Sequence, residues 1–128
     1  MVPEAMRAAW LLKEEYGLET RVVNMHTVKP LDLEALVQAA EQTRLMVTAE
    51  EHQVGGFGNI VAGATLRHRQ NYKHPVLFDM VGVNDRFGIS GKPWELVQEF
   101  GLSAEHIAQR VLQLRERMQG REERASAA

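Results

Sequence analysis

The 128-residue chain contains no cysteine, which excludes disulfide bonds, thiolate nucleophiles and cysteine-ligated metals. It has no apolar run approaching the roughly 20 residues that a membrane-spanning helix requires. Basic residues (15 Lys and Arg) do not exceed acidic ones (17 Asp and Glu), so there is no electrostatic case for binding nucleic acid or an anionic membrane. The start of the chain lacks a basic segment followed by an apolar core, and no secretory signal is predicted. We expect one domain of a cytoplasmic protein.

What the chain does have is a pair of glycine-rich segments. Residues 50–59 carry one group of glycines and residues 82–91 carry another. Each segment follows a short apolar run and precedes an amphipathic stretch. This order predicts two turns between a strand and a helix, where open α/β sheets gather their binding surfaces.

Short apolar runs and amphipathic stretches alternate along the whole chain. Strands are predicted at residues 21–25, 45–49 and 75–81. Helices are predicted over residues 3–16, 57–69 and 93–100. Two more helices are predicted to begin after the N-cap residues Asp32 and Ser103. The order predicts an α/β fold with three layers, α/β/α, around a small, mostly parallel sheet. Three strands are few for a parallel sheet covered on both faces, which suggests that a strand is missing at the front. The domain is predicted to span 1–119, with a disordered or frayed tail over 120–128.

Neither glycine-rich segment has the spacing of a nucleotide fingerprint. Backbone amides at the start of the helix that begins at Phe57 could still hold an anion. The alternative is that Gly55, Gly56 and Gly58 permit a tight turn and close helix packing.

Two histidines, His26 and His52, each follow a predicted strand, so we expect both at the same edge of the sheet. His52 follows Glu50 and Glu51 and could act as a carboxylate-oriented general base. His26, His52 and an acidic residue could also bind a metal. Because no local nucleophile and no short ligand spacing accompany them, hydrogen bonding at a packed loop or interface is the favoured interpretation.

The second glycine-rich segment carries four further candidates. Arg86 could bind a carboxylate or phosphate, or pair with a neighbouring acid. Phe87 is an aromatic anchor, either tucked under its loop or buried in a partner. If the chain were an independent enzyme on a flavodoxin-like scaffold, His52 or Asp85 would be the catalytic candidate, and Ser90 lies in the same loop as Asp85. We predict no catalytic, cofactor-binding or metal-ligating residue, and assign the histidines, glycines and these four residues to interface or anion contacts.

Three segments resemble the C-terminal domain of the transketolase family, whose members depend on thiamine diphosphate. Residues 23–32 are similar to a strand, turn and helix of that domain, residues 48–58 to its next strand and turn, and residues 82–102 to its final segment. The run Asp85-Arg86-Phe87-Gly88, followed after one residue by Ser90-Gly91, is most similar to short, split transketolases, whose C-terminal half is a separate subunit. Ile89 departs from that pattern, which commonly has glutamate there.

This resemblance covers about residues 2–114. It implies that cofactor binding and subunit assembly belong to different domains of the enzyme. Thiamine diphosphate and magnesium bind between two other domains, the pyrophosphate-binding and pyrimidine-binding domains, whose motifs this chain lacks. The resemblance implies a non-catalytic module that binds no cofactor alone and serves subunit assembly in an enzyme that transfers ketol (glycolaldehyde) groups. Its expected partners are those two domains, in the same or a separate chain, within a homo- or hetero-oligomer.

Two alternative functions stay open: the C-terminal domain of a 2-oxoacid dehydrogenase beta subunit, and a free-standing regulatory domain that senses an anion. The resemblance also implies that the family's N-terminal edge strand and its central strand are lacking, which indicates a fragment or a truncated start. The central strand would lie between residues 21–25 and 45–49. It could be lost, supplied by a partner, or replaced by direct pairing of residues 22–23 with residues 46–47.

Overall fold

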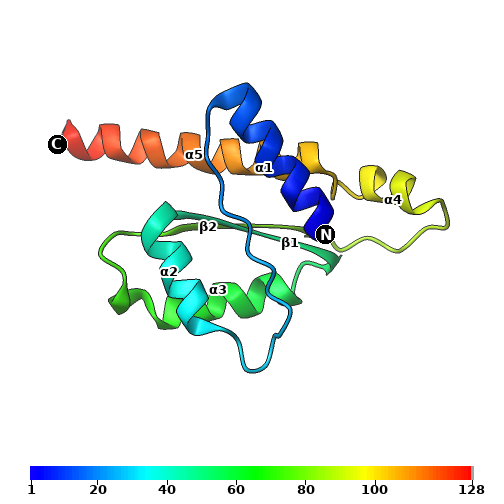
Figure 1. Ribbon diagram of the computed structural model, residues 1–128, viewed down its shortest axis with the longest axis horizontal. Helices are drawn as coiled ribbons and strands as arrows, with labels where there is room; N and C mark the ends of the chain where they lie inside the picture. The colour runs from blue at the N-terminus through cyan, green and yellow to red at the C-terminus, as the bar shows by residue number, and fades with distance from the viewer. Residues whose placement is uncertain (128) are drawn as a thin grey trace.

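The computed structural model describes residues 1–127 and arranges helices around a small sheet (Figure 1). In chain order the elements are α1 (Val2–Tyr16), α2 (Leu33–Thr43), β1 (Leu45–Gln53), α3 (Phe57–Arg67), a 3-10 helix η1 (Arg69–Asn71), β2 (Leu77–Val83), α4 (Pro93–Glu99) and α5 (Ala104–Ser126). No helix in this described part is both long enough and apolar enough to cross a membrane.

The sheet consists of β1 and β2, which pair in parallel with Leu45 opposite Leu77 and Ala49 opposite Val81. Helix α5 packs on one face of the sheet and α1 packs against α5, while α2 and α3 cover the other face (Figure 1). The predicted three-layer α/β arrangement with a small parallel sheet is therefore confirmed.

The main core lies between α1, α5 and β2. Ala8 and Leu12, one helical turn apart on α1, are fully buried there against Val81 and the start of α5. On α5, Ile107 and Ala108 face the same cluster. Apolar burial holds the N-terminal and C-terminal helices together on this one face of the sheet.

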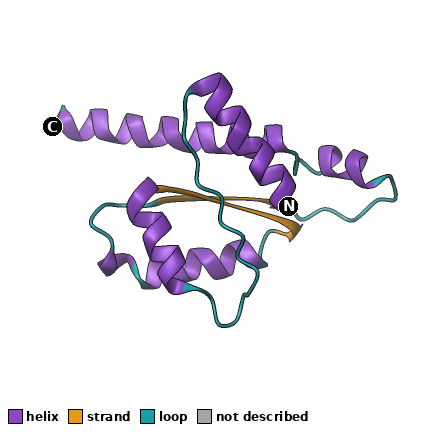
Figure 2. Cartoon of the chain, viewed as in Figure 1, coloured by secondary structure: helices purple, strands orange, loops and turns teal. Residues whose placement is uncertain are grey.

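The predicted strand at residues 21–25 does not form. These residues belong to a long irregular loop that joins α1 to α2 (Figure 2). A strand needs a neighbouring edge to pair with, and within the described residues the sheet contains only β1 and β2. Direct pairing of residues 22–23 with residues 46–47 therefore does not complete the sheet. Arg21 instead donates hydrogen bonds to the side chains of Gln38 and Gln42 on α2, at 3.0 and 2.6 Å.

One helix end agrees with the sequence-based prediction and another differs from it. Asp32 caps α2 as predicted, because its Oδ1 accepts a hydrogen bond from the amide of Ala35 at 3.0 Å. Helix α5, in contrast, continues through Gly120 to Ser126, where the sequence suggests a frayed tail. Residue 128, the last of that predicted tail, lies outside the described residues, and the domain boundary at 119 stays a prediction.

Candidate functional site at the carboxyl end of the sheet

The two glycine-rich loops meet at one edge of the molecule, as expected. Because β1 and β2 are parallel, the segments that follow them leave from the same end of the sheet. The Val54 amide donates to the Val83 carbonyl at 2.9 Å, and the Gln53 side chain donates to the Arg86 carbonyl at 3.2 Å. These contacts make the two loops one surface.

A buried carboxylate organises the first loop. Glu50, only 7% exposed, accepts hydrogen bonds from the amides of Phe57 and Gly58, both at 2.8 Å. A negative charge at the start of α3 satisfies its free amides and interacts favourably with the helix dipole. The position at which the sequence allows a bound anion is therefore occupied by the chain's own glutamate. The spacing of seven residues between Glu50 and Phe57 matches no recognised capping signal, so sequence reasoning missed this role.

The glycines of the first loop are needed for close approach. A Cβ on Gly56 would lie 2.7 Å from Glu50 Oε2, and a Cβ on Gly58 would lie 2.6 Å from the sulfur of Met80. Gly55 has a φ of 120°, which other residues rarely adopt. These positions fit the packing interpretation, in which glycine lets α3 lie against the sheet and lets the glutamate reach its amides.

The two candidate histidines have separate hydrogen-bond partners. His26 lies in the irregular loop, where its Nδ1 is 2.7 Å from the hydroxyl of Thr27. His52 is exposed at the end of β1, with its Nδ1 3.3 Å from the Gln53 carbonyl. Glu51, its neighbour in sequence, forms an ion pair with the N-terminal ammonium at 3.2 Å. Across residues 1–127 no group of three His, Asp or Glu side chains could hold a metal ion.

The second loop is tethered at its base by Arg86. Its guanidinium group donates to the carboxylate of Glu99 at 2.8 Å and to that residue's carbonyl at 3.2 Å. It also lies 4.9 Å from the ring centre of Phe100, within cation–π range. Of the two roles that the sequence left open for Arg86, pairing with an acid of the same chain is the one that the geometry shows. Asp85 supports the turn with a positive φ of 46°.

Beyond this tether the chain displays apolar side chains to solvent. The loop of residues 84–92, together with α4, projects from the body of the domain (Figure 1). Phe87 is 98% exposed, and Ile89 and Trp94 are more than half exposed. Phe87 is therefore not tucked under its loop. Ser90 is exposed on the same loop. An exposed aromatic side chain with further exposed apolar residues beside it is typical of a contact surface.

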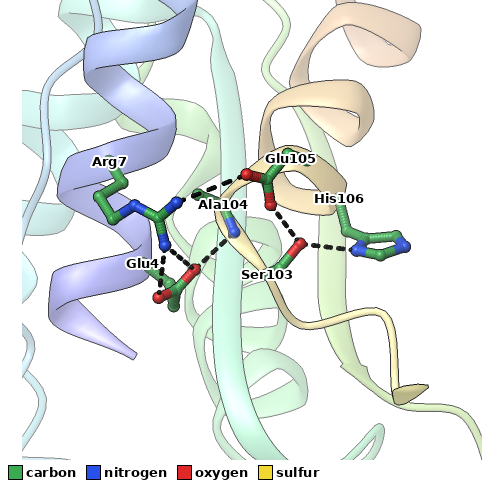
Figure 3. Close-up of polar contacts among 6 residues, drawn as sticks. All are labelled: Glu4, Arg7, Ser103, Ala104, Glu105 and His106. Carbon is green, nitrogen blue, oxygen red and sulfur yellow. Dashed lines mark hydrogen bonds and ion pairs between the residues drawn. The ribbon is translucent and has the colours of Figure 1, made fainter. Parts of the chain in front are cut away.

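A second polar cluster, which sequence reasoning missed, joins α1 to the start of α5 (Figure 3). Glu4 on α1 accepts a hydrogen bond from the Ala104 amide at 2.7 Å. Arg7 bridges Glu4 and Glu105, at 3.3 and 3.5 Å. Ser103 is the N-cap residue of α5, as predicted, but its side chain makes no capping bond to the helix amides, and Glu4 from another helix accepts from the first amide of α5.

The hydroxyl of Ser103 has two partners in this cluster. It donates to Glu105 Oε2 at 2.7 Å and lies 2.8 Å from His106 Nδ1. The hydrogen bond from Ser103 lowers the pKa of Glu105. In a nucleophilic serine site the histidine accepts the serine proton. Here that proton goes to the glutamate, and the serine is 1% exposed. The cluster therefore joins two helices and does not form a nucleophile and base.

Comparison with known proteins identifies the family. Residues 1–107 match the family described as transketolase, C-terminal domain, and the chain belongs to that family. It is 39% identical over 113 residues to a putative transketolase C-terminal section from Methanocaldococcus jannaschii, a match that covers 88% of this chain and 33% of the relative. It is 35% identical over 113 residues to one of the subunits of an apulose-4-phosphate transketolase from Phocaeicola vulgatus, covering 88% of this chain and 34% of the relative.

A third relative carries a different enzyme name. The chain is 40% identical over 129 aligned residues to a 1-deoxy-D-xylulose-5-phosphate synthase from a Synechococcus species, covering all of this chain and 19% of the relative. The chain thus spans about a third or less of the length of these relatives. The resemblance noted in the sequence to the transketolase C-terminal domain is confirmed, including its likeness to subunits of split transketolases.

Proposed function

We propose that this chain is a non-catalytic C-terminal module of a thiamine-diphosphate-dependent, transketolase-type enzyme, and that it serves subunit assembly. The enzyme as a whole would transfer ketol groups in the cytoplasm, with its cofactor and magnesium held by the pyrophosphate-binding and pyrimidine-binding domains. The observation that carries this proposal is Phe87, which is 98% exposed on a loop whose base is fixed by Arg86 and Glu99.

The polar groups of the candidate site support an architectural role. Glu50 is used to cap α3, Arg86 is paired with Glu99, and Glu51 is paired with the N-terminus. Glu50 and Arg86 thus make contacts within the chain at the two loops, where they could otherwise contact a substrate. The exposed apolar tip of the 84–92 loop then offers an aromatic anchor that a protein partner could bury in a pocket.

The same contacts argue against the anion-sensing alternative. A free-standing sensor would need unoccupied donors at the loop, yet the amides at the start of α3 already donate to Glu50 at 2.8 Å. The named relatives include subunits of split transketolases, and this favours the transketolase branch over a 2-oxoacid dehydrogenase beta subunit.

Truncation of the anchor tests the proposal. We expect Phe87→Ala to weaken the complex between this chain and a fragment carrying the two cofactor-binding domains of a transketolase-type enzyme. Loss of an aromatic hot spot costs about 2 kcal/mol, or roughly a 30-fold rise in Kd, measured by sedimentation velocity. Leu66→Ala is the matched control, since Leu66 is an exposed apolar residue of α3 outside the 84–92 loop (66% exposed). Equal weakening by both variants, or by neither, would contradict docking through Phe87.

A further inference from the structure

Helix α1 carries a stripe of large apolar side chains that faces away from the core. Val2, Met6 and Trp10 recur every four residues along it and are 41%, 56% and 61% exposed. Each of the last two precedes a buried core residue, Ala8 or Leu12, by two positions. Two residues turn a helix by roughly 200°, so the stripe points to the side opposite the core. Apolar residues exposed singly are ordinary, but a continuous row on one helix face is typical of a contact surface.

Two residues of opposite charge border this apolar stripe on the same edge. Arg7 and Glu14 are separated by about two helical turns, so both lie on one side of the row that ends at Trp10. Along the helix one stands before Trp10 and the other after it, at nearly equal spacing. Glu14 is exposed and forms no ion pair with the described residues, and the Arg7 side chain stays 61% exposed although it bridges Glu4 and Glu105. The edge is therefore self-complementary in charge about Trp10.

A second copy of the chain matches both the apolar stripe and its charged edge. A two-fold axis at Trp10 pairs two copies of α1 in antiparallel orientation and sets the same edge of each helix side by side. The two Trp10 rings then meet at the axis, and Arg7 of each copy lies level with the partner's Glu14. A parallel pair would instead place like charges together. Lys13, the charged residue that continues the stripe, pairs with Glu19 at 2.8 Å, so its ammonium group already has a partner within the chain.

We propose that the stripe of Val2, Met6 and Trp10 on α1 binds a second copy of this chain, antiparallel and about a two-fold axis at Trp10. The helix has 15 residues, or about 22 Å at 1.5 Å per residue, and a single pair of such helices buries less than the roughly 1,200 Å² of a standard interface. The dimer is therefore weak, and chain concentrations of about 0.1–1 mM are needed to populate it. The surface belongs to α1 and does not include the 84–92 loop, so it is independent of docking through Phe87.

Sedimentation equilibrium of the full chain at concentrations up to about 1 mM tests the proposal. We expect a monomer–dimer equilibrium in which Trp10→Ala raises the dimer dissociation constant at least tenfold, because the two-fold axis removes two aromatic contacts at once. Glu14→Arg should weaken the dimer as well, since it sets arginines of the two copies side by side. The matched control is Glu15→Arg, which makes the same change of charge on the next exposed residue, roughly 100° around the helix and off the stripe. It should leave the dissociation constant unchanged.

A chain that stays monomeric at about 1 mM would overturn the proposal. A dimer that Trp10→Ala leaves unchanged would overturn it too, as would equal weakening by Glu14→Arg and Glu15→Arg. If the chain is monomeric and Trp10→Ala instead weakens its complex with a fragment carrying the cofactor-binding domains, the stripe belongs to those domains and the proposal fails. Phe87→Ala should leave the dimer intact, which separates this proposal from the function proposed above. Circular dichroism checks the fold of each variant, and if either Trp10→Ala or Glu14→Arg is unfolded the other decides.

Discussion

The buried carboxylate of Glu50 offers a quantitative test of how the first loop is held. Its two oxygens accept hydrogen bonds from the first turn of α3, each at 2.8 Å, and the residue is 7% exposed. Hydrogen bonds to a charged group contribute about 1.5–3 kcal/mol each, and the interaction with the helix dipole adds about 0.3–1 kcal/mol.

Glu50→Gln keeps the shape of the side chain but removes the charge and one acceptor. One amide of α3 then faces the NH₂ group of glutamine and stays unsatisfied in a buried place. We expect the free energy of unfolding to fall by about 2–3 kcal/mol, which corresponds to roughly 10 °C in Tm for a chain of this length. Urea unfolding followed by circular dichroism measures the first quantity, and a thermal melt measures the second.

The neighbouring glutamate provides a matched control. Glu51 carries the same chemistry, but its side chain is 70% exposed and its one partner is the N-terminal ammonium. Exposed ion pairs contribute little, so Glu51→Gln should change the free energy of unfolding by less than about 1 kcal/mol. If the two variants lose the same stability, or if Glu50→Gln loses less than Glu51→Gln, the buried cap does not hold the loop.

Two further predictions concern packing and pH. Gly58→Ala should destabilise the chain by about 2 kcal/mol, because the new Cβ would lie 2.6 Å from the Met80 sulfur. A Cβ on Gly63 would meet nothing within 4 Å, so Gly63→Ala should stabilise α3 by up to about 1 kcal/mol. Chemical unfolding of both variants measures the two changes. Ser103→Ala should raise the pKa of Glu105 toward its ordinary 4.5, as measured by NMR titration, because the hydrogen bond from Ser103 lowers it. A lowered carboxyl pKa stabilises the fold at pH values above the ordinary pKa of 4.5, and this gain is lost as the pH falls through the pKa of the folded state. The wild type should therefore lose more stability than Ser103→Ala on acidification. An unchanged Glu105 pKa in the variant would refute the hydrogen bond.

The sequence predicts the layers well because periodicity and caps are local signals. The helices around Leu12 and Leu36 follow from apolar spacing, and the Asp32 cap follows from the residue type that best satisfies free amides. The two glycine-rich loops are predicted at one edge because parallel strands point the same way.

What the sequence could not supply depends on partners distant along the chain. Residues 21–25 have a composition suited to a strand, but strand formation requires a neighbouring edge, and a groove lies between them and β1. Ser103 is the N-cap residue of α5 as predicted, but the carboxylate that accepts the bond from the Ala104 amide belongs to Glu4, a hundred residues away. The role of Glu50 was missed for a similar reason, since no short motif marks it.

The central claim is that this chain contributes assembly, while the chemistry and the cofactor belong to other domains. The most direct measurement is a calorimetric titration of the purified full chain with thiamine diphosphate in the presence of Mg²⁺, followed by an assay for ketol transfer. The account predicts no heat of binding and no turnover. A binding isotherm accompanied by turnover that disappears in His52→Ala would contradict it.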